Sequence, residues 1–141
     1  MEKIILDLPV HSFQIDANGH VNNAVYNQWM EIAIARFFET MELPLTYLKQ
    51  QGIMPILAET HIAYRQPILL GDAVRLEMWL SKLAGIYCLM EFRFFKGDGD
   101  LAAMGQQKGV FINATTQRPI RLNSDHAQRF ARFLQPDAIA V

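Results

Sequence analysis

The run Asp16–Asn23 holds the side chains of this chain that are best suited to chemistry. It places a carboxylate, an imidazole and three asparagine amides around Gly19 within eight residues. The run lies directly ahead of an apolar segment, Ala24–Met41, whose pattern predicts a helix. A helix N-terminus exposes unpaired N–H groups and the positive end of the helix dipole. These groups could hold a carbonyl oxygen while the neighbouring side chains activate water, so the run predicts acyl transfer to water.

Asp16 is the first candidate catalytic residue in this run. Its carboxylate would orient and deprotonate a water, or would itself attack the carbonyl carbon. His20 would act as a general base, or would hydrogen-bond the substrate and fix the loop, with Asn18 assisting. The alternative is a purely structural turn, because Asp-x-Asn-Gly is ordinary turn chemistry in which Gly19 supplies a positive φ.

Three further residues are candidates for substrate binding: Asn22, Asn23 and Tyr26. At least one of the two asparagines should cap the predicted helix instead of contacting substrate. Tyr26 could pack in the core with its hydroxyl reaching the loop. The backbone N–H groups of Asn23–Tyr26, in the first helical turn, are the natural donors to an oxyanion.

Other chemistries find little support in the sequence. The three serines lie outside any Gly-x-Ser-x-Gly elbow, and no glycine-rich nucleotide loop follows a predicted strand. The remaining histidines have no metal-ligand spacing with one another or with Cys88. We therefore expect neither a metal nor a resident cofactor.

Length and composition indicate one domain over residues 1–141. Hydrophobic residues make up 51% of the chain, and this apolar excess predicts burial against further copies, as a dimer or a dimer of dimers (a homotetramer). The net charge is −1, with 13 Lys and Arg residues scattered along the chain, which argues against a nucleic-acid partner.

The same composition predicts a cytoplasmic protein. Ile4–Leu6 is too short for the core of a signal peptide, and Glu31 and Arg36 interrupt the longest apolar segment before it could span a membrane. Cys88 is the single cysteine and lies in an apolar run, so we expect a buried, structural thiol in a reducing compartment.

The hydrophobic periodicity predicts a strand, a long helix that is apolar almost all round and therefore buried, and then a meander of long strands. In chain order we expect a strand Lys3–Ile15, weakened at Pro9, and then two helices, Asn23–Met41 and Pro44–Gln51. Four strands should follow: Ile53–Ile68, Val74–Ser81, Ile86–Lys96 and Leu101–Ala114. A C-terminal helix, capped by Asn123 or Ser124, should have apolar positions through Leu134. Gly105 and Gly109 should mark a bulge or a close approach. The order predicts an α+β fold, with an antiparallel sheet wrapped around one long central helix.

The stretch Asp-x-x-Gly-His-Val-Asn-Asn-x-x-Tyr, here Asp16–Tyr26, resembles the signature of hot-dog-fold acyl thioesterases. The group it resembles most is the 4-hydroxybenzoyl-CoA thioesterase-like family, which includes long-chain acyl-CoA thioesterases. Ile62–Pro67, followed by Gly71 and Asp72, is similar to the second strand and turn of that family. The resemblance extends from about Leu6 to Leu122.

This resemblance implies a hot-dog fold, hydrolysis of acyl-CoA or an acyl-carrier thioester, and Asp16 as the catalytic carboxylate. Coenzyme A would enter as part of the substrate. The resemblance also implies a homodimer or tetramer with its sites at subunit interfaces. Plant acyl-carrier-protein thioesterases are similar at Asp16, Asn18 and His20, but their downstream acidic residue falls where this chain has Gln66 and Pro67.

Two other functions are compatible with this fold. Hot-dog dehydratases and enoyl hydratases use a similar aspartate-asparagine-histidine spacing, with the histidine one residue later. A non-enzymatic acyl-CoA sensor is the third reading, although this chain has no spare length or basic helix for the DNA-binding segment that usually accompanies one.

Overall fold

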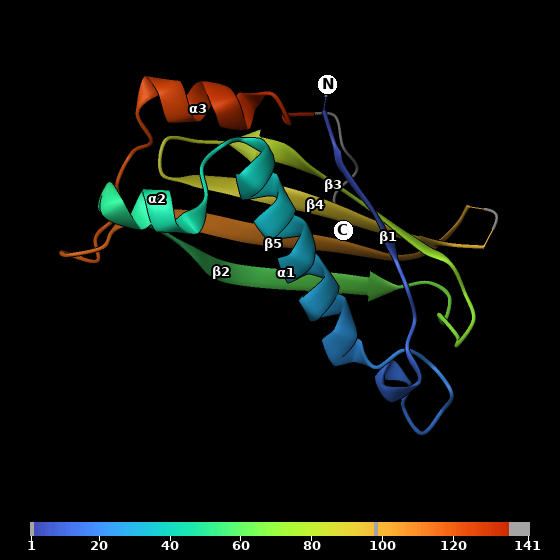
Figure 1. Ribbon diagram of the computed structural model, residues 1–141. Coiled ribbons are helices and arrows are strands. Elements are labelled where there is room, and N and C mark those ends of the chain that lie inside the picture. Colours follow the sequence, from blue (N-terminus) through green and yellow to red (C-terminus); the bar gives the residue numbers. More distant parts are fainter. Residues whose placement is uncertain (1, 98, 136–141) are drawn as a thin grey trace.

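The structure, a computed structural model, describes residues 2–97 and 99–135. Its elements are β1 (Ile4–Leu8), a 3₁₀ turn (Ser12–Gln14), α1 (Asn23–Thr40), α2 (Leu45–Gln50), β2 (Ile53–Tyr64), β3 (Val74–Leu83), β4 (Tyr87–Lys96), β5 (Asp100–Asn113) and α3 (Ser124–Ala131). The strands form one antiparallel sheet in the order β1-β3-β4-β5-β2 (Figure 1). The predicted α+β hot-dog architecture is confirmed.

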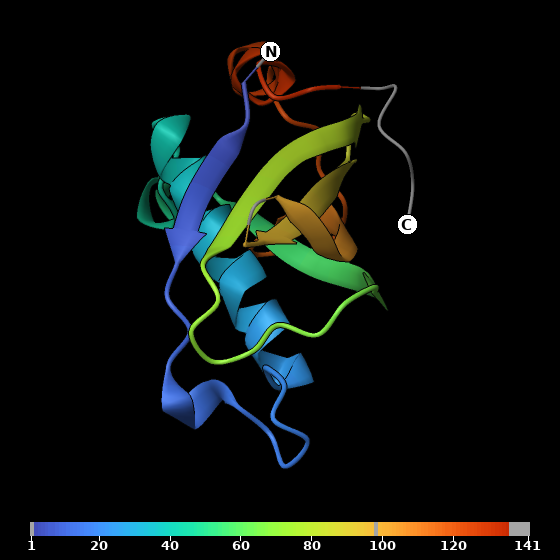
Figure 2. The same ribbon diagram turned by 90° about the vertical axis from the view of Figure 1, so that its right-hand side faces the viewer.

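Helix α1 crosses one face of the sheet, and its start is the best-predicted boundary in the chain (Figures 1 and 2). Asn22 is the N-cap, and its side-chain oxygen accepts a hydrogen bond of 2.9 Å from the Ala24 N–H. The buried positions of α1 recur every three or four residues and form one stripe: Val25, Tyr26, Trp29, Met30, Ala33, Phe37 and Phe38. None of the described helices is long and apolar enough to cross a membrane.

The expectation that this helix is buried on nearly every side is wrong for the single chain. Ile32 is 49% exposed, and Ala35 is also exposed. The sheet covers one face of α1 and leaves the opposite face, on which Ile32 and Ala35 lie among polar residues, in contact with solvent. The apolar sequence therefore indicates more burial than one copy of the chain provides.

Aromatic rings hold the C-terminal half of α1 against α3. Phe37 makes edge-to-face contacts with Phe130 and Phe133, at centroid distances of 5.4 and 5.0 Å. Phe130 in turn meets Phe111 of β5 at 5.3 Å. Such pairs add to the free energy gained from burying the rings, so this cluster fixes one end of α1 relative to the sheet.

Two predicted strands are shorter than their patterns indicated. β1 ends at Leu8, because Pro9 has no N–H for the sheet, and the chain then makes its 3₁₀ turn before Ile15 pairs with Val21 in a single bridge. β2 ends at Tyr64, because the next two N–H groups both turn to one acceptor, the carbonyl of Ala102.

The C-terminal helix also ends before its predicted limit. Asn123 caps it, as expected, and its side-chain oxygen accepts from the His126 N–H at 2.8 Å. The helix stops at Ala131, and Leu134 instead forms a bridge with Leu80. Leu134 thus pairs with β3, although its hydrophobic spacing alone predicted a helix.

Each of the two readings of the β5 glycines holds at one of them. A Cβ atom at Gly105 would lie 3.0 Å from Met30 Sδ, so this glycine lets α1 approach the sheet. Gly109 pairs with Leu57 at a bulge of β2, which lies between Leu57 and Glu59. Two further bulges lie between Leu80 and Lys82 and between Phe94 and Phe95.

Replacing Phe37 by alanine should lower the free energy of unfolding by about 3–5 kcal/mol, because it leaves a cavity at the centre of the aromatic cluster. Urea unfolding followed by circular dichroism, at fixed protein concentration, measures this change. Phe13→Ala is the matched control: this ring is 82% exposed, and its loss should change stability by less than about 0.5 kcal/mol. Equal effects of the two substitutions would contradict the assigned core.

Candidate active site

The loop before α1 is a tight reversal built on its own backbone. The Asp16 N–H donates to the His20 carbonyl at 2.7 Å, and the Gly19 N–H donates to the Asp16 carbonyl at 3.0 Å. Gly19 has a φ of +79°, a conformation that glycine adopts without strain. The Val21 N–H then donates to the Ile68 carbonyl at 2.8 Å, which ties the loop to the segment that follows β2.

Only one oxygen of the Asp16 carboxylate accepts hydrogen bonds within this turn. Oδ1 accepts from the Asn18 N–H at 2.9 Å and from the His20 N–H at 3.2 Å. Within the described chain, Oδ2 receives no hydrogen bond. The turn reading and the chemical reading of Asp16 are therefore compatible, because the backbone fixes one oxygen and leaves the other for a reacting group.

A cavity of about 340 Å³ opens beside this carboxylate. It brings together five of the six predicted site residues, Asp16, Asn18, His20, Asn23 and Tyr26, with Val21, Tyr64, Arg65, Gln66 and Pro67. Asn22 is absent from this lining and uses its side-chain oxygen to cap α1. Capping by one of the asparagines was expected, and Asn22 is the residue that does it.

Asn23, the first residue of α1, lines this cavity. The Ala24 N–H is bonded to the Asn22 side chain, and the Val25 N–H donates to the Asn22 carbonyl at 2.9 Å. The Asn23 N–H has no acceptor among the described residues. It lies at the positive end of the helix dipole, where a negatively charged oxygen is stabilised.

Two tyrosines form one wall of the cavity. Tyr26 is buried and meets the ring of Tyr64 edge to face, with the centroids 5.1 Å apart. Burial raises the pKa of Tyr26 to about 12 and also raises the pKa of Tyr64. Both phenols are therefore neutral near pH 7, and they can donate a hydrogen bond but cannot serve as bases.

The sequence reasoning did not assign site roles to Tyr64, Gln66 and Pro67. These residues end β2 and follow it, 41 or more positions after the start of α1 in the chain, and the sheet brings them to the loop. The nearest signal was the resemblance of Ile62–Pro67 to a family motif. Arg65, the cation of this lining, has its guanidinium 3.5 Å from the sulfur of Met104.

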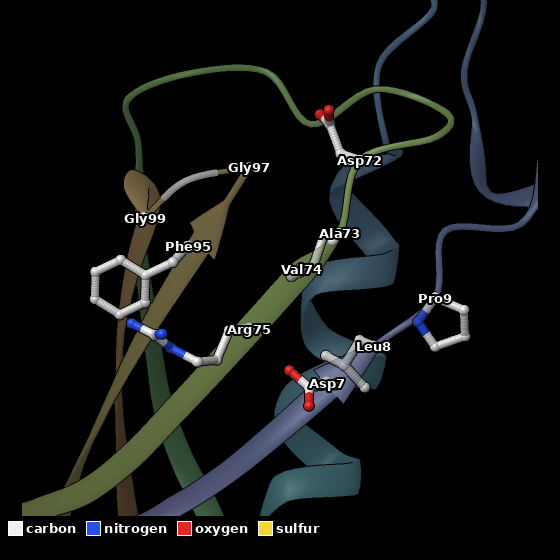
Figure 3. Close-up of a pocket in the computed structure, with 10 residues that line it drawn as sticks. All are labelled: Asp7, Leu8, Pro9, Asp72, Ala73, Val74, Arg75, Phe95, Gly97 and Gly99. Carbon is white, nitrogen blue, oxygen red and sulfur yellow. The ribbon is translucent and has the colours of Figure 1, made fainter.

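A larger cavity, of about 560 Å³, lies where β1 ends and β3 begins, and Figure 3 shows its lining. Asp72 accepts a hydrogen bond from the Leu69 N–H at 2.8 Å and so closes a turn. Arg75 pairs with Glu77 at 3.0 Å and stacks on the ring of Phe95, 4.9 Å from its centroid. Asp72 and Arg75 are thus engaged in holding the turn and the sheet. The third charged residue of the lining is Asp7, and the lining contains no helical residue that could offer a free N–H. This cavity is therefore a poorer candidate than the one at Asp16.

A third cavity, of about 390 Å³, lies between the second half of α1 and the sheet, and its lining is almost wholly apolar. Its one carboxylate, Glu31, is exposed to solvent. In the described parts of the chain, no three His, Cys, Asp or Glu side chains are grouped so that they could hold a metal ion.

Comparisons with known proteins identify the family to which this chain belongs. The thioesterase-like superfamily matches residues 10–130. The chloroplastic acyl-acyl carrier protein thioesterase ATL3 of Arabidopsis thaliana is 23% identical over 133 residues, which cover 94% of this chain and 70% of that protein.

Two solved structures share the fold over nearly their whole length. The DHNA-CoA thioesterase of Staphylococcus aureus has a TM-score of 0.84 at 21% identity, covering 94% of this chain and 91% of its own. A thioesterase of Thermus thermophilus, solved in complex with coenzyme A and Zn, has a TM-score of 0.78 at 28% identity and covers 92% of both chains.

Proposed function

Because this chain belongs to the thioesterase-like superfamily, we propose that it hydrolyses an acyl-CoA to the free acid and coenzyme A, with Asp16 as the catalytic carboxylate. The observation that carries the proposal is that Asp16 and Asn23 line the same cavity, and the Asn23 N–H has no acceptor among the described residues. The coenzyme A bound to the Thermus thermophilus relative supports this thiol. Coenzyme A enters with the substrate, and no resident cofactor is needed.

In the first route Asp16 acts as a general base. The free Oδ2 takes a proton from water, and the water oxygen attacks the thioester carbon. The resulting oxyanion accepts a hydrogen bond from the Asn23 N–H, which the charge on that oxygen makes stronger than in the ground state. The carbon–sulfur bond then breaks, and the leaving thiolate takes up the proton held by Asp16.

In the second route Asp16 is the nucleophile. Oδ2 attacks the thioester carbon, thiolate leaves, and water hydrolyses the acyl-aspartyl anhydride to release the acid. The same oxyanion donor serves both tetrahedral intermediates. His20 and Asn18, which line the same cavity, would hold the water or the substrate in either route.

We further propose that the working unit is a homodimer, alone or within a dimer of dimers, formed through β2. This strand is twelve residues long and lies at the edge of the sheet. Its exposed side chains include Met54, Ile56 and Leu57. A long apolar edge of this kind needs a partner to satisfy its backbone groups and cover its side chains. The exposed Ile32 of α1 lies on a helix face that a second copy could also cover.

Pairing of two copies would also explain why the polar and apolar cavities are separated. Along α1, Asn23 and Glu31 lie about 12 Å apart at the α-helical rise. If β2 pairs antiparallel with its own copy about a two-fold axis, the Tyr64 end of one strand lies beside the Ile53 end of the other. The carboxylate cavity of one protomer would then adjoin the apolar cavity of its partner.

Asp16→Asn should lower kcat for thiol release by at least about a hundredfold, because an amide cannot take the proton or attack carbon. Its side-chain oxygen can still accept from the Asn18 and His20 N–H groups, so the loop should keep its shape and the thermal unfolding midpoint should be unchanged. Asp7→Asn is the matched control, an exposed aspartate outside this cavity, and should retain wild-type rates.

A panel of acyl-CoAs of different length and aromaticity, with released thiol detected colorimetrically, is the direct test of the activity. Near-wild-type turnover by Asp16→Asn on a good substrate would remove Asp16 from the mechanism. Loss of conjugation in an enoyl-CoA without free thiol would identify a hydratase instead.

Asn23→Pro should test the oxyanion donor in isolation. Proline is well tolerated at the first position of a helix, and the preceding Asn22 already has the extended conformation that proline requires, with φ −61° and ψ 141°. Losing this one N–H should lower kcat by about a hundredfold to a thousandfold. Asn23→Ala keeps the N–H, so its kcat should fall much less. Equal decreases of kcat in the two variants would refute the Asn23 N–H as the oxyanion donor.

Met54→Lys combined with Ile56→Lys should convert the proposed dimer to a monomer, because it places two charged side chains on the strand edge that the second copy would cover. Light scattering coupled to size exclusion measures the mass. Ile5→Lys, at the opposite edge of the sheet and 57% exposed in the wild type, is the control and should leave the mass unchanged. A wild-type chain that is monomeric at micromolar concentration would refute the β2 dimer.

A further inference from the structure

The apolar cavity has a graded lining that runs from an exposed mouth to a buried floor. Fourteen residues line it: Glu31, Ile34, Ala35, Phe37, Phe38, Leu45, Pro55, Ile56, Leu57, Cys88, Met90, Gly109, Phe111 and Phe130. Leu45 and Leu57 are 54% and 51% exposed, whereas Phe111 and Phe130 are 2% and 1% exposed. The cavity therefore opens beside β2 and extends inward to the aromatic cluster.

The floor offers almost nothing for a polar ligand to bond. Cys88 is its one polar side chain besides the exposed Glu31. Burial raises the pKa of the Cys88 thiol to about 12, so it is neutral, and it is already hydrogen-bonded to the backbone of Gly109. A hydroxyl or carboxyl group placed here would lose its hydrogen bonds to water without replacement.

Gly109 lets the side chains of Met90 and Cys88 lie close to the backbone of β5 in the wall of this cavity. A Cβ atom there would lie 3.3 Å from Met90 Cε and 3.5 Å from Cys88 Sγ, and both of these side chains line the cavity. Unlike Gly19, Gly109 does not have a positive φ, so its backbone conformation is not reserved for glycine. A side chain at position 109 would therefore narrow the cavity by displacing Met90.

We propose that this cavity takes the hydrocarbon chain of an unbranched aliphatic acyl thioester, and that Gly109 determines the chain length. This inference rests on the proposed function and extends it from acyl thioesters in general to aliphatic ones. Each methylene buried in the cavity contributes about fourfold to kcat/KM, until the floor at Phe111 and Phe130 stops the chain.

The test compares butanoyl-, octanoyl-, dodecanoyl- and 4-hydroxybenzoyl-CoA as substrates of the wild type and of Gly109→Ala and Gly109→Leu. The wild type should prefer a longer aliphatic chain over both butanoyl-CoA and the hydroxylated ring. Gly109→Leu should lower kcat/KM for the preferred long chain at least about tenfold and leave butanoyl-CoA within about threefold, with Gly109→Ala in between.

Val110→Ala is the matched control, because Val110 is the neighbour of Gly109 on β5 and does not line the cavity. Its chain-length profile should be that of the wild type. A Gly109→Leu profile equal to the wild-type profile, in a protein that unfolds cooperatively, would overturn the inference, as would a wild-type preference for the hydroxylated ring.

The cavity can also be tested apart from turnover. Isothermal titration of dodecanoyl-CoA into the Asp16→Asn variant should give binding that the double variant with Gly109→Leu weakens at least about tenfold. If no acyl-CoA releases thiol but this difference in binding is found, the proposed function fails and the cavity assignment stands. If thiol is released but the two binding affinities are equal, the cavity assignment fails and the proposed function stands.

Discussion

The unpaired amides at the start of α1 are the constraint on which the site depends. A helix cannot satisfy its first N–H groups internally, so the residues before it must do so. Asn22 accepts from one amide through its side chain and from another through its carbonyl, and the Asn23 N–H has no acceptor among the described residues. Burial of Tyr26 immediately afterwards holds this end of the helix against the sheet. The proposed oxyanion donor would therefore be fixed before substrate binds, and a donor fixed in advance is effective toward a developing negative charge.

The two oxygens of the Asp16 carboxylate also differ in their hydrogen bonding. Two backbone amides hold Oδ1 and shape the turn, and this division leaves Oδ2 with a defined position and no partner within the described residues. A side chain held only by solvent would have to lose rotational freedom in the transition state, whereas this one has already lost it on folding. The structural role of one oxygen is thus compatible with the chemical role that we propose for the other.

The sheet gives the molecule two edges of different character. β1 is short, whereas β2 is long, apolar and exposed, and both cavities that suit an acyl thioester lie along it. The polar cavity adjoins the Tyr64 end of β2, and the apolar cavity adjoins Pro55–Leu57 near the other end. Antiparallel pairing of this edge with its own copy would bring unlike ends together. The apolar excess of the sequence, the exposed face of α1 and the separation of the two cavities would then have one common cause.

The sequence by itself determined the features that depend on neighbours a few residues apart. The turn at Gly19, the start of α1 at Asn23 and the alternation that produces the long strands all follow from local capping, φ preference and side-chain periodicity. Only the tertiary structure decided that Tyr64 and Gln66 join Asp16, that Asn22 caps the helix and does not line the cavity, and that one face of α1 stays exposed. These outcomes depend on where the β2–β5 ladder ends and on how much of α1 the sheet can cover. Contacts between segments far apart in the sequence determine where the ladder ends and how much of α1 is covered. A local sequence pattern therefore cannot predict either.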